Sequence, residues 1–182
     1  MILVCDSREQ DPLVFPKTVG VEVVVEHLSV GDYTARHGTV MDTTICERKS
    51  IQDAFTSFTG EAYERERAKI LRAKEAGLTY ILAVEATATE FLKGCSYWSG
   101  GESHEHKKTG LALLRQFAML QRKYGVILWY CSSRKEMALL ILEYFLAESR
   151  RLQNLATTAT AAAILDVGGG EKESKRGKGG GG

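Results

Sequence analysis

Several features are scarce in this chain of 182 residues, and each scarcity excludes a class of protein or a kind of site. The formal net charge is only +1, so bulk charge does not attract the protein to nucleic acid, and any DNA-binding face must be a local patch. The longest apolar runs are too short and too charged to span a bilayer, so no membrane segment is expected. The first residues lack the basic and apolar regions of a signal peptide, so we expect no secretion signal.

Cysteine is also sparse and widely spaced. The four cysteines, Cys5, Cys46, Cys95 and Cys131, never form a CxxC pair, whereas a zinc site needs closer spacing. Three of them lie in or at the end of apolar, strand-like runs. We interpret them as buried thiols in a reducing compartment, which favours a cytoplasmic protein.

What is present is an ordinary globular core, with 44% hydrophobic residues. Apolar or β-branched runs predict strands over residues 2–5, 21–28, 79–86 and 126–131. Periodic apolar positions predict helices beginning at Ser50, over 61–77, over 109–125 and after Ser133. Residues 94–107 read as a loop. Because strands and helices alternate after residue 50, we expect an α/β domain with helices on both faces of a mixed sheet.

The pattern of helices and strands stops at about residue 153. The remaining sequence is rich in Ala and Thr, then in Gly, and it is weakly basic. We expect a folded domain over residues 1–152 and a flexible tail over 153–182.

The chemistry-bearing stretch is GDYTARHGTVMDTTICERKSIQD, residues 31–53. His37-Gly38 predicts the turn of a hairpin whose second strand ends in Glu47-Arg48-Lys49. Because side chains alternate along a strand, Glu47 and Lys49 point the same way, roughly 7 Å apart, and Arg48 points to the other side.

A carboxylate beside an ammonium at a strand end suits phosphodiester hydrolysis. The carboxylate holds a divalent cation, and the lysine orients or deprotonates a water or stabilises charge on the phosphate. The hairpin would bring Asp32 to the same cation as Glu47. Asp6 and Glu9, just past the first strand, could join them.

Each of these residues also has a plainer interpretation. Glu47 and Lys49 could form a surface ion pair, which stabilises little. Asp6 could be a turn residue. Asp53 stands three residues after Ser50, so it could cap the helix that begins there.

Gly31-Asp32 followed by Glu47-Arg48-Lys49-Ser-Ile-Gln-Asp53 resembles the GDx(n)ERKxxxD signature of the XPF-family nuclease domain. Further similarity lies in Asp6-Ser-Arg8-Glu9, in Tyr63 to Glu66 and in Tyr80 to Glu85, so it runs over residues 2–150. The resemblance implies a restriction-endonuclease-like fold, a three-layer α/β/α domain with a central mixed sheet. The loop REQDPLVFP looks more like bacterial or phage members of the family.

The resemblance implies a role for each matched residue. Asp32 and Glu47 would bind Mg²⁺, for which Mn²⁺ substitutes, and Lys49 would be the catalytic lysine. Arg48 would act in the site through phosphate or an acidic neighbour. The residues implied to line or support the cleft are Asp6, Arg8, Glu9 and Asp53, with Arg8 and Arg65 as DNA contacts.

The implied activity is metal-dependent cleavage of branched or single-strand-containing DNA in repair, recombination or phage DNA processing, without a small-molecule cofactor. The alternatives are a phage resolvase or restriction-type nuclease of the same fold, and a DNA-binding module that does not cut. Three departures matter. Glu61 stands where the family often has Arg, and Pro12 and Pro16 stand where archaeal and eukaryotic relatives have a helix after the first strand. We also expect no helix-hairpin-helix domain to follow. A homodimer through the C-terminal helices is a further expectation, drawn from the apolar stripe between Met137 and Phe145.

Overall fold

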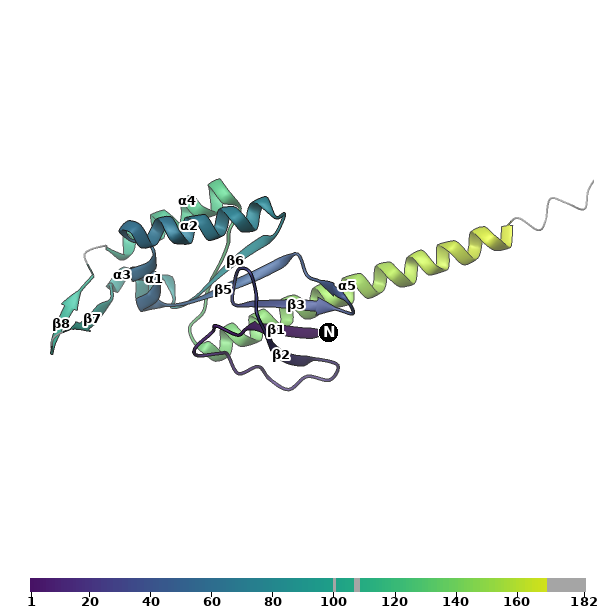
Figure 1. Ribbon diagram of the computed structural model, residues 1–182, viewed down its shortest axis with the longest axis horizontal. Coiled ribbons are helices and arrows are strands. Elements are labelled where there is room, and N and C mark those ends of the chain that lie inside the picture. The colour runs from purple at the N-terminus through teal and green to yellow at the C-terminus, as the bar shows by residue number, and fades with distance from the viewer. Residues whose placement is uncertain (100, 107–108, 170–182) are drawn as a thin grey trace, which may run out of the picture. The chain divides into compact units, whose positions relative to one another are not determined.

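The computed structural model of the chain describes residues 1–99, 101–106 and 109–169 (Figure 1). Its main sheet has seven strands, six of them in the order β2-β1-β3-β5-β6-β9, and β4 pairs with β3. The strand bounds are β1 Ile2–Asp6, β2 Glu22–Glu26, β3 Tyr33–His37, β4 Val40–Met41, β5 Thr44–Ser50, β6 Thr79–Glu85 and β9 Ile127–Tyr130. β1 runs antiparallel to β3, and β3 to β5, whereas β5, β6 and β9 are parallel. The predicted mixed sheet is therefore confirmed.

Helices cover both faces of this sheet, and strand periodicity decides which residues meet them. On β6, Leu82 and Val84 pack with α1 (Ile51–Ser57), α2 (Gly60–Glu75) and α4 (Gly110–Tyr124). Ile81 and Ala83 of the same strand face the other side, where they pack with the first turns of α5 (Arg134–Gly169). Figure 1 shows α2 and α4 side by side above the sheet. The three-layer α/β/α architecture is confirmed.

The helix starts follow the capping residues of the sequence. The hydroxyls of Ser50, Thr109 and Ser133 accept hydrogen bonds from backbone N–H groups three residues later, at 3.0 to 3.2 Å. This is the N-cap interaction that satisfies free N–H groups of a first helical turn. The predicted helices therefore begin where the sequence places them.

The predicted loop over residues 94–107 is wrong. That segment carries a hairpin of β7 (Ser96–Ser99) and β8 (Glu102–Glu105), in which Ser96 pairs with Glu105 and Ser99 with Glu102. Gly101 adopts a φ of 85°, a left-handed conformation that a tight hairpin turn needs. The sequence pattern also missed α3 (Ala88–Lys93), which is capped by Thr87 and Glu90.

The chain divides into two compact units, Met1–Phe145 and Leu146–Gly182. In the second unit α5 continues as a helix to Gly169, across part of the segment expected to be flexible. Alanine has the highest helix propensity, and this segment is rich in alanine. Residues 170–182 of the predicted tail lie outside the described residues. No helix in the described part of the chain is long and apolar enough to cross a membrane.

Candidate active site

The hairpin of β3 and β5 brings Asp32 to the end of β5. Tyr33 pairs with Cys46, and the backbone N–H of Asp32 donates to the carbonyl of Cys46 at 2.9 Å. The N–H of Arg48 donates to Asp32 Oδ2 at 2.7 Å, which fixes the carboxylate beside the ERK segment. Gly31 has a φ of 78°, and a Cβ there would lie 3.1 Å from Ile45 Cβ. A side chain at position 31 would therefore strain the turn that presents Asp32.

Gly31, Asp32 and Arg48 line a cleft of about 900 Å³ at the ends of β1, β5 and β6. Its wall carries seven acidic and six basic side chains, so the wall is strongly polar but its net charge is close to zero. The acidic ones are Asp6, Glu9, Asp11, Asp32, Glu47, Asp53 and Glu85, and the basic ones are Arg8, Arg48, Lys49, Lys69, Arg72 and Arg134. The proposed metal ligands, the proposed catalytic lysine and their neighbours thus share one cavity.

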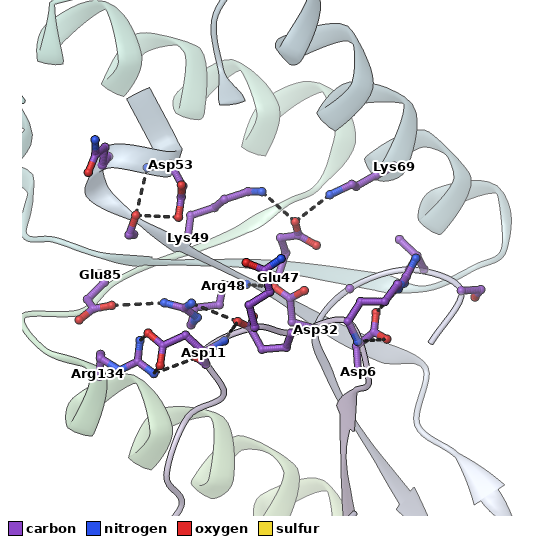
Figure 2. Close-up of a pocket in the computed structure, with 18 of the residues that line it drawn as sticks. Asp6, Asp11, Asp32, Glu47, Arg48, Lys49, Asp53, Lys69, Glu85 and Arg134 are labelled. Carbon is purple, nitrogen blue, oxygen red and sulfur yellow. Dashed lines mark hydrogen bonds and ion pairs between the residues drawn. The ribbon is translucent and has the colours of Figure 1, made fainter. Parts of the chain in front are cut away.

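Glu47 and Lys49 lie on the same side of β5, as strand alternation predicts. Lys49 Nζ lies 3.0 Å from Glu47 Oε1, and Lys69 Nζ of α2 lies 3.0 Å from the same oxygen (Figure 2). Glu47 is 3% exposed, and burial alone would raise its pKa. The ammonium groups of Lys49 and Lys69 outweigh burial, and the pKa of Glu47 is lowered.

Asp32 differs from Glu47 in its electrostatic surroundings. Burial, and then the nearby charge of Glu47, raises the pKa of Asp32 to about 7, although the N–H of Arg48 and the charge of Lys49 act in the opposite direction. A carboxylate with a raised pKa is one whose negative charge lacks compensation. The cleft therefore holds a site where one more cation would be stabilised.

Asp32 and Glu47 fit a hard divalent cation as two carboxylate ligands from adjacent chain segments. No group of three or more His, Cys, Asp or Glu side chains among the described residues is arranged to hold a metal. Two protein ligands suffice for Mg²⁺, which keeps several of its waters in protein sites. The fit is thus with a hydrated cation on two carboxylates and not with a closed protein cage.

Arg48 points away from Glu47, toward the loop after β1 and the end of β6. Its guanidinium lies 3.2 Å from Glu9 Oε1 and 3.5 Å from Glu85 Oε2 (Figure 2). The exposed fractions are 10% for the Arg48 side chain and 9% for that of Glu9. Arg48 therefore ties two acidic neighbours to the ERK segment, and its role in the site stays a prediction.

The carboxylate of Asp6 is buried and hydrogen-bonded to neighbouring residues. It accepts hydrogen bonds from the side chain and the backbone N–H of Arg8 and from the N–H of Leu28. Burial would raise the pKa of Asp6, but the hydrogen bonds from Arg8 lower it overall. Asp6 thus shapes the loop at the cleft edge and holds Arg8 there.

The remaining predicted residues fall into two places. Asp53 lines the cleft, and the hydroxyl of Ser50 caps α1 by accepting from the Asp53 backbone N–H at 3.0 Å while it donates to the Asp53 carboxylate at 2.7 Å, so Asp53 supports the cap and Ser50 is the capping side chain. Arg65 is exposed on α2 and is not among the residues that line the cleft. The structure therefore does not bring Arg65 to the proposed ligands.

Sequence reasoning missed six charged residues at this site. Glu66 and Lys69 of α2 contact the ERK segment, Arg134 of α5 binds Asp11 at 2.6 Å, and Arg72 and Glu85 line the wall. A signal existed for one pair, because Glu66 and Lys69 stand three residues apart and so lie on one face of a helix. Asp11 and Arg134 are 123 residues apart in the sequence, so no local sequence pattern predicts their ion pair.

A mixed sheet between two helix layers, with a polar cleft at the ends of its strands, is the architecture of a restriction-endonuclease-like domain. The ERCC4 domain model matches residues 5–144. The chain therefore belongs to the ERCC4 domain family, the family of the XPF nuclease domain.

Solved structures agree with this assignment. XPF from Aeropyrum pernix matches with a TM-score of 0.57 and 25% identity, over 86% of this chain and 69% of that chain. A second structure of that protein, in complex with DNA, matches with a TM-score of 0.56 and 24% identity, over 85% of this chain and 66% of that one. A search of curated proteins returns no match. The fold is thus the XPF nuclease fold.

Proposed function

We propose that this protein is a metal-dependent endonuclease that hydrolyses phosphodiester bonds in DNA. The observation that carries the proposal is the convergence of Asp32, Glu47 and Lys49 in one polar cleft of an ERCC4 domain. Asp32, whose pKa is raised by burial and by Glu47, is where a cation would be most stabilising. We assign Asp32 and Glu47 as the ligands of Mg²⁺, for which Mn²⁺ would substitute.

When bound, the cation would supply Lewis-acid activation of a water and neutralise charge on the phosphate. Lys49 would act as an ammonium. Burial lowers its pKa, but Glu47 and Glu66 outweigh burial and hold the pKa above its usual value. A charged ammonium donates hydrogen bonds and stabilises the negative charge that builds on the phosphate. Of the roles considered for Lys49, charge stabilisation and positioning of water are favoured over proton abstraction.

Asp6, Glu9, Arg48 and Asp53 would support the site. Asp6 binds Arg8, Glu9 binds Arg48, and Asp53 binds Ser50 at the start of α1. These side chains would fix the cleft walls without being metal ligands. Arg8, at the cleft edge, would contact the phosphates of DNA, as Arg65 would from α2. Such phosphate contacts make binding weaken steeply with added salt.

The substrate we propose is branched or single-strand-containing DNA, in repair, recombination or phage DNA processing. The support is family membership and the solved relative in complex with DNA. A bacterial or phage origin, and a resolvase or restriction-type role, stay predictions. So does the homodimer. Of the stripe that suggested it, Met137, Ile141 and Phe145 are fully buried in the core, whereas Leu140 is 40% exposed.

The experiment is cleavage of labelled flap, fork, bubble, duplex and single-stranded DNA with Mg²⁺, Mn²⁺, Ca²⁺ or chelator. We expect Asp32→Asn and Glu47→Ala to lose cleavage by at least about a hundredfold while DNA binding in Ca²⁺ changes only a few-fold. The matched control is Glu61→Gln, an exposed carboxylate on α2 outside the cleft.

Two results would overturn this assignment. One is cleavage by both variants at the wild-type rate. The other is a wild-type protein that binds every substrate and cuts none, which would favour the DNA-binding module instead. Circular dichroism of each variant separates loss of chemistry from loss of folding.

A further inference from the structure

α2 contributes two charged side chains to the site that the signature residues do not include. Lys69 Nζ lies 3.0 Å from Glu47 Oε1 and 3.1 Å from Glu66 Oε1. Lys49 Nζ contacts the same two oxygens at 3.0 and 3.2 Å. Glu47, Lys49, Glu66 and Lys69 therefore form a closed ion-pair ring in which every ammonium touches both carboxylates.

The ring is neutral and largely buried. The exposed fraction of the side chain is 5% for Glu47, 9% for Glu66 and 12% for Lys49, but 34% for Lys69. Lys69 lines the cleft, whereas Glu66 does not (Figure 2). Lys69 is thus the most solvent-accessible member of the ring, and its ammonium can exchange a carboxylate contact for water most easily.

Glu47 Oε1 is shared by two ammonium groups in this arrangement. A divalent cation on the same carboxylate would repel both of them and compete for the same lone pairs. Lys49 remains anchored by Glu66 when Glu47 turns to a cation, because its second contact in the ring does not involve Glu47.

We propose that Lys69 is a built-in competitor for the metal site: divalent-cation binding displaces it from Glu47, and Glu66 holds Lys49 in place during the exchange. This inference rests on the proposed function, since it takes Asp32 and Glu47 as the ligands. It makes Lys69 and Glu66 positioning residues that tune cation affinity. The displaced Lys69 ammonium would then face the cleft.

The two α2 residues must then have opposite effects on affinity. Replacing Lys69 by Gln removes the competitor, so cations bind more tightly. Replacing Glu66 by Gln frees both lysines to pair with Glu47 alone, so cations bind more weakly. Residues with only a structural role would weaken binding in both cases.

The test is calorimetric titration of Ca²⁺ and Mg²⁺ into the full chain without DNA. We expect Lys69→Gln to bind about tenfold more tightly than wild type and Glu66→Gln about tenfold more weakly. The charge-matched controls are Lys74→Gln and Glu75→Gln, exposed residues on the same helix and outside the ring, which should stay within about threefold. Lys69→Arg keeps the charge and should stay near wild type.

Unchanged or weaker cation binding by Lys69→Gln, relative to Lys74→Gln, would overturn the inference, as would an absence of cation binding in all variants. A second readout is the rise in melting temperature with added Ca²⁺, which should be larger in Lys69→Gln than in wild type. DNA cleavage is scored separately. If cleavage depends on Asp32 but Lys69→Gln does not change the cation affinity, only this inference is refuted. If Lys69→Gln binds Ca²⁺ more tightly but the wild-type protein cleaves no DNA, only the nuclease proposal is refuted.

Discussion

Asp32 is the residue at which stability and the proposed function oppose each other. In the unfolded chain an aspartate ionises at roughly pH 3.9, whereas burial and Glu47 raise the pKa of Asp32 to about 7 in the folded protein. Between these values the metal-free folded state keeps a proton that the unfolded state has lost. Stability of the metal-free protein therefore falls as pH rises through this window.

We predict that Asp32→Asn stabilises the protein in chelator, because the amide carries no charge to desolvate. The gain over wild type should grow from near zero at about pH 4 to on the order of 1–3 kcal/mol at about pH 8. Urea unfolding across this pH range measures it, with Glu61→Gln as the control. A gain that is the same at every pH would contradict the electrostatic cause.

Arg48 is expected to act through Glu9. We predict that Arg48→Met lowers the free energy of unfolding by about 2–4 kcal/mol, because it leaves two carboxylates without their guanidinium in a poorly solvated place. A double-mutant cycle with Glu9→Gln should give a coupling of about 1–3 kcal/mol. The same cycle with Glu85→Gln should give less, since that carboxylate is farther away at 3.5 Å and is 25% exposed. Equal couplings would refute the ranking.

The residues of the site that sequence reasoning found are those placed by local structure. Asp32 and Glu47 are 15 residues apart, so one hairpin decides that they meet. Lys49 follows from strand alternation. Lys69 and Glu66 could not be assigned the same way. Lys69 contacts Glu47 and Glu66 contacts Lys49 only because of how α2 is rotated against the sheet, and packing of its apolar face decides that rotation.

At the scale of elements, the packing of α3 against α4 depends on one glycine. A Cβ at Gly110 would lie 1.5 Å from the carbonyl oxygen of Phe91, which is backbone and cannot turn away. Gly110 stands in the first turn of α4, where alanine ordinarily stabilises a helix by up to about 1 kcal/mol. The two effects have opposite signs, and the close approach dominates.

We predict that Gly110→Ala lowers the free energy of unfolding by about 2 kcal/mol or more, measured by chemical denaturation. Leu111→Ala is the control: this neighbouring side chain is 47% exposed, and its loss should change stability by less than about 0.5 kcal/mol. A stabilised Gly110→Ala variant would mean that α3 and α4 do not pack this closely.

The elements that sequence patterns identified are those with both a cap and a periodic apolar face. α4 has Thr109 as its cap and buries Leu113, Phe117 and Leu120. α3 has only six residues and too few turns to show a period, although Thr87 and Glu90 form a capping box that could have indicated it. The hairpin of β7 and β8 was missed because its exposed β8 strand shows no apolar alternation.

At the scale of the whole molecule, the first compact unit contains everything that the proposed function needs. Among the residues whose burial the structure describes, the buried core residues end at Phe145 and the residues that line the cleft end at Arg134, while the ERCC4 match ends at residue 144. The basic residues near the C-terminus would at most add diffuse attraction to phosphate. The boundary at residue 152, predicted from composition, therefore removes none of these described core or cleft residues.

We predict that a protein of residues 1–152 folds cooperatively and melts within about 3 °C of the full chain, because it keeps every described residue of the buried apolar core. Its cleavage rate at saturating DNA should equal that of the full chain, while its DNA affinity at low salt falls by no more than about threefold through the lost tail charges. Calorimetry and single-turnover cleavage measure these quantities, and a truncation at residue 138 is the control. That cut removes Ile141 and Phe145 from the core and should prevent folding. A 1–152 protein that folds but no longer cuts would show that residues 153–182 take part in the chemistry or in substrate placement.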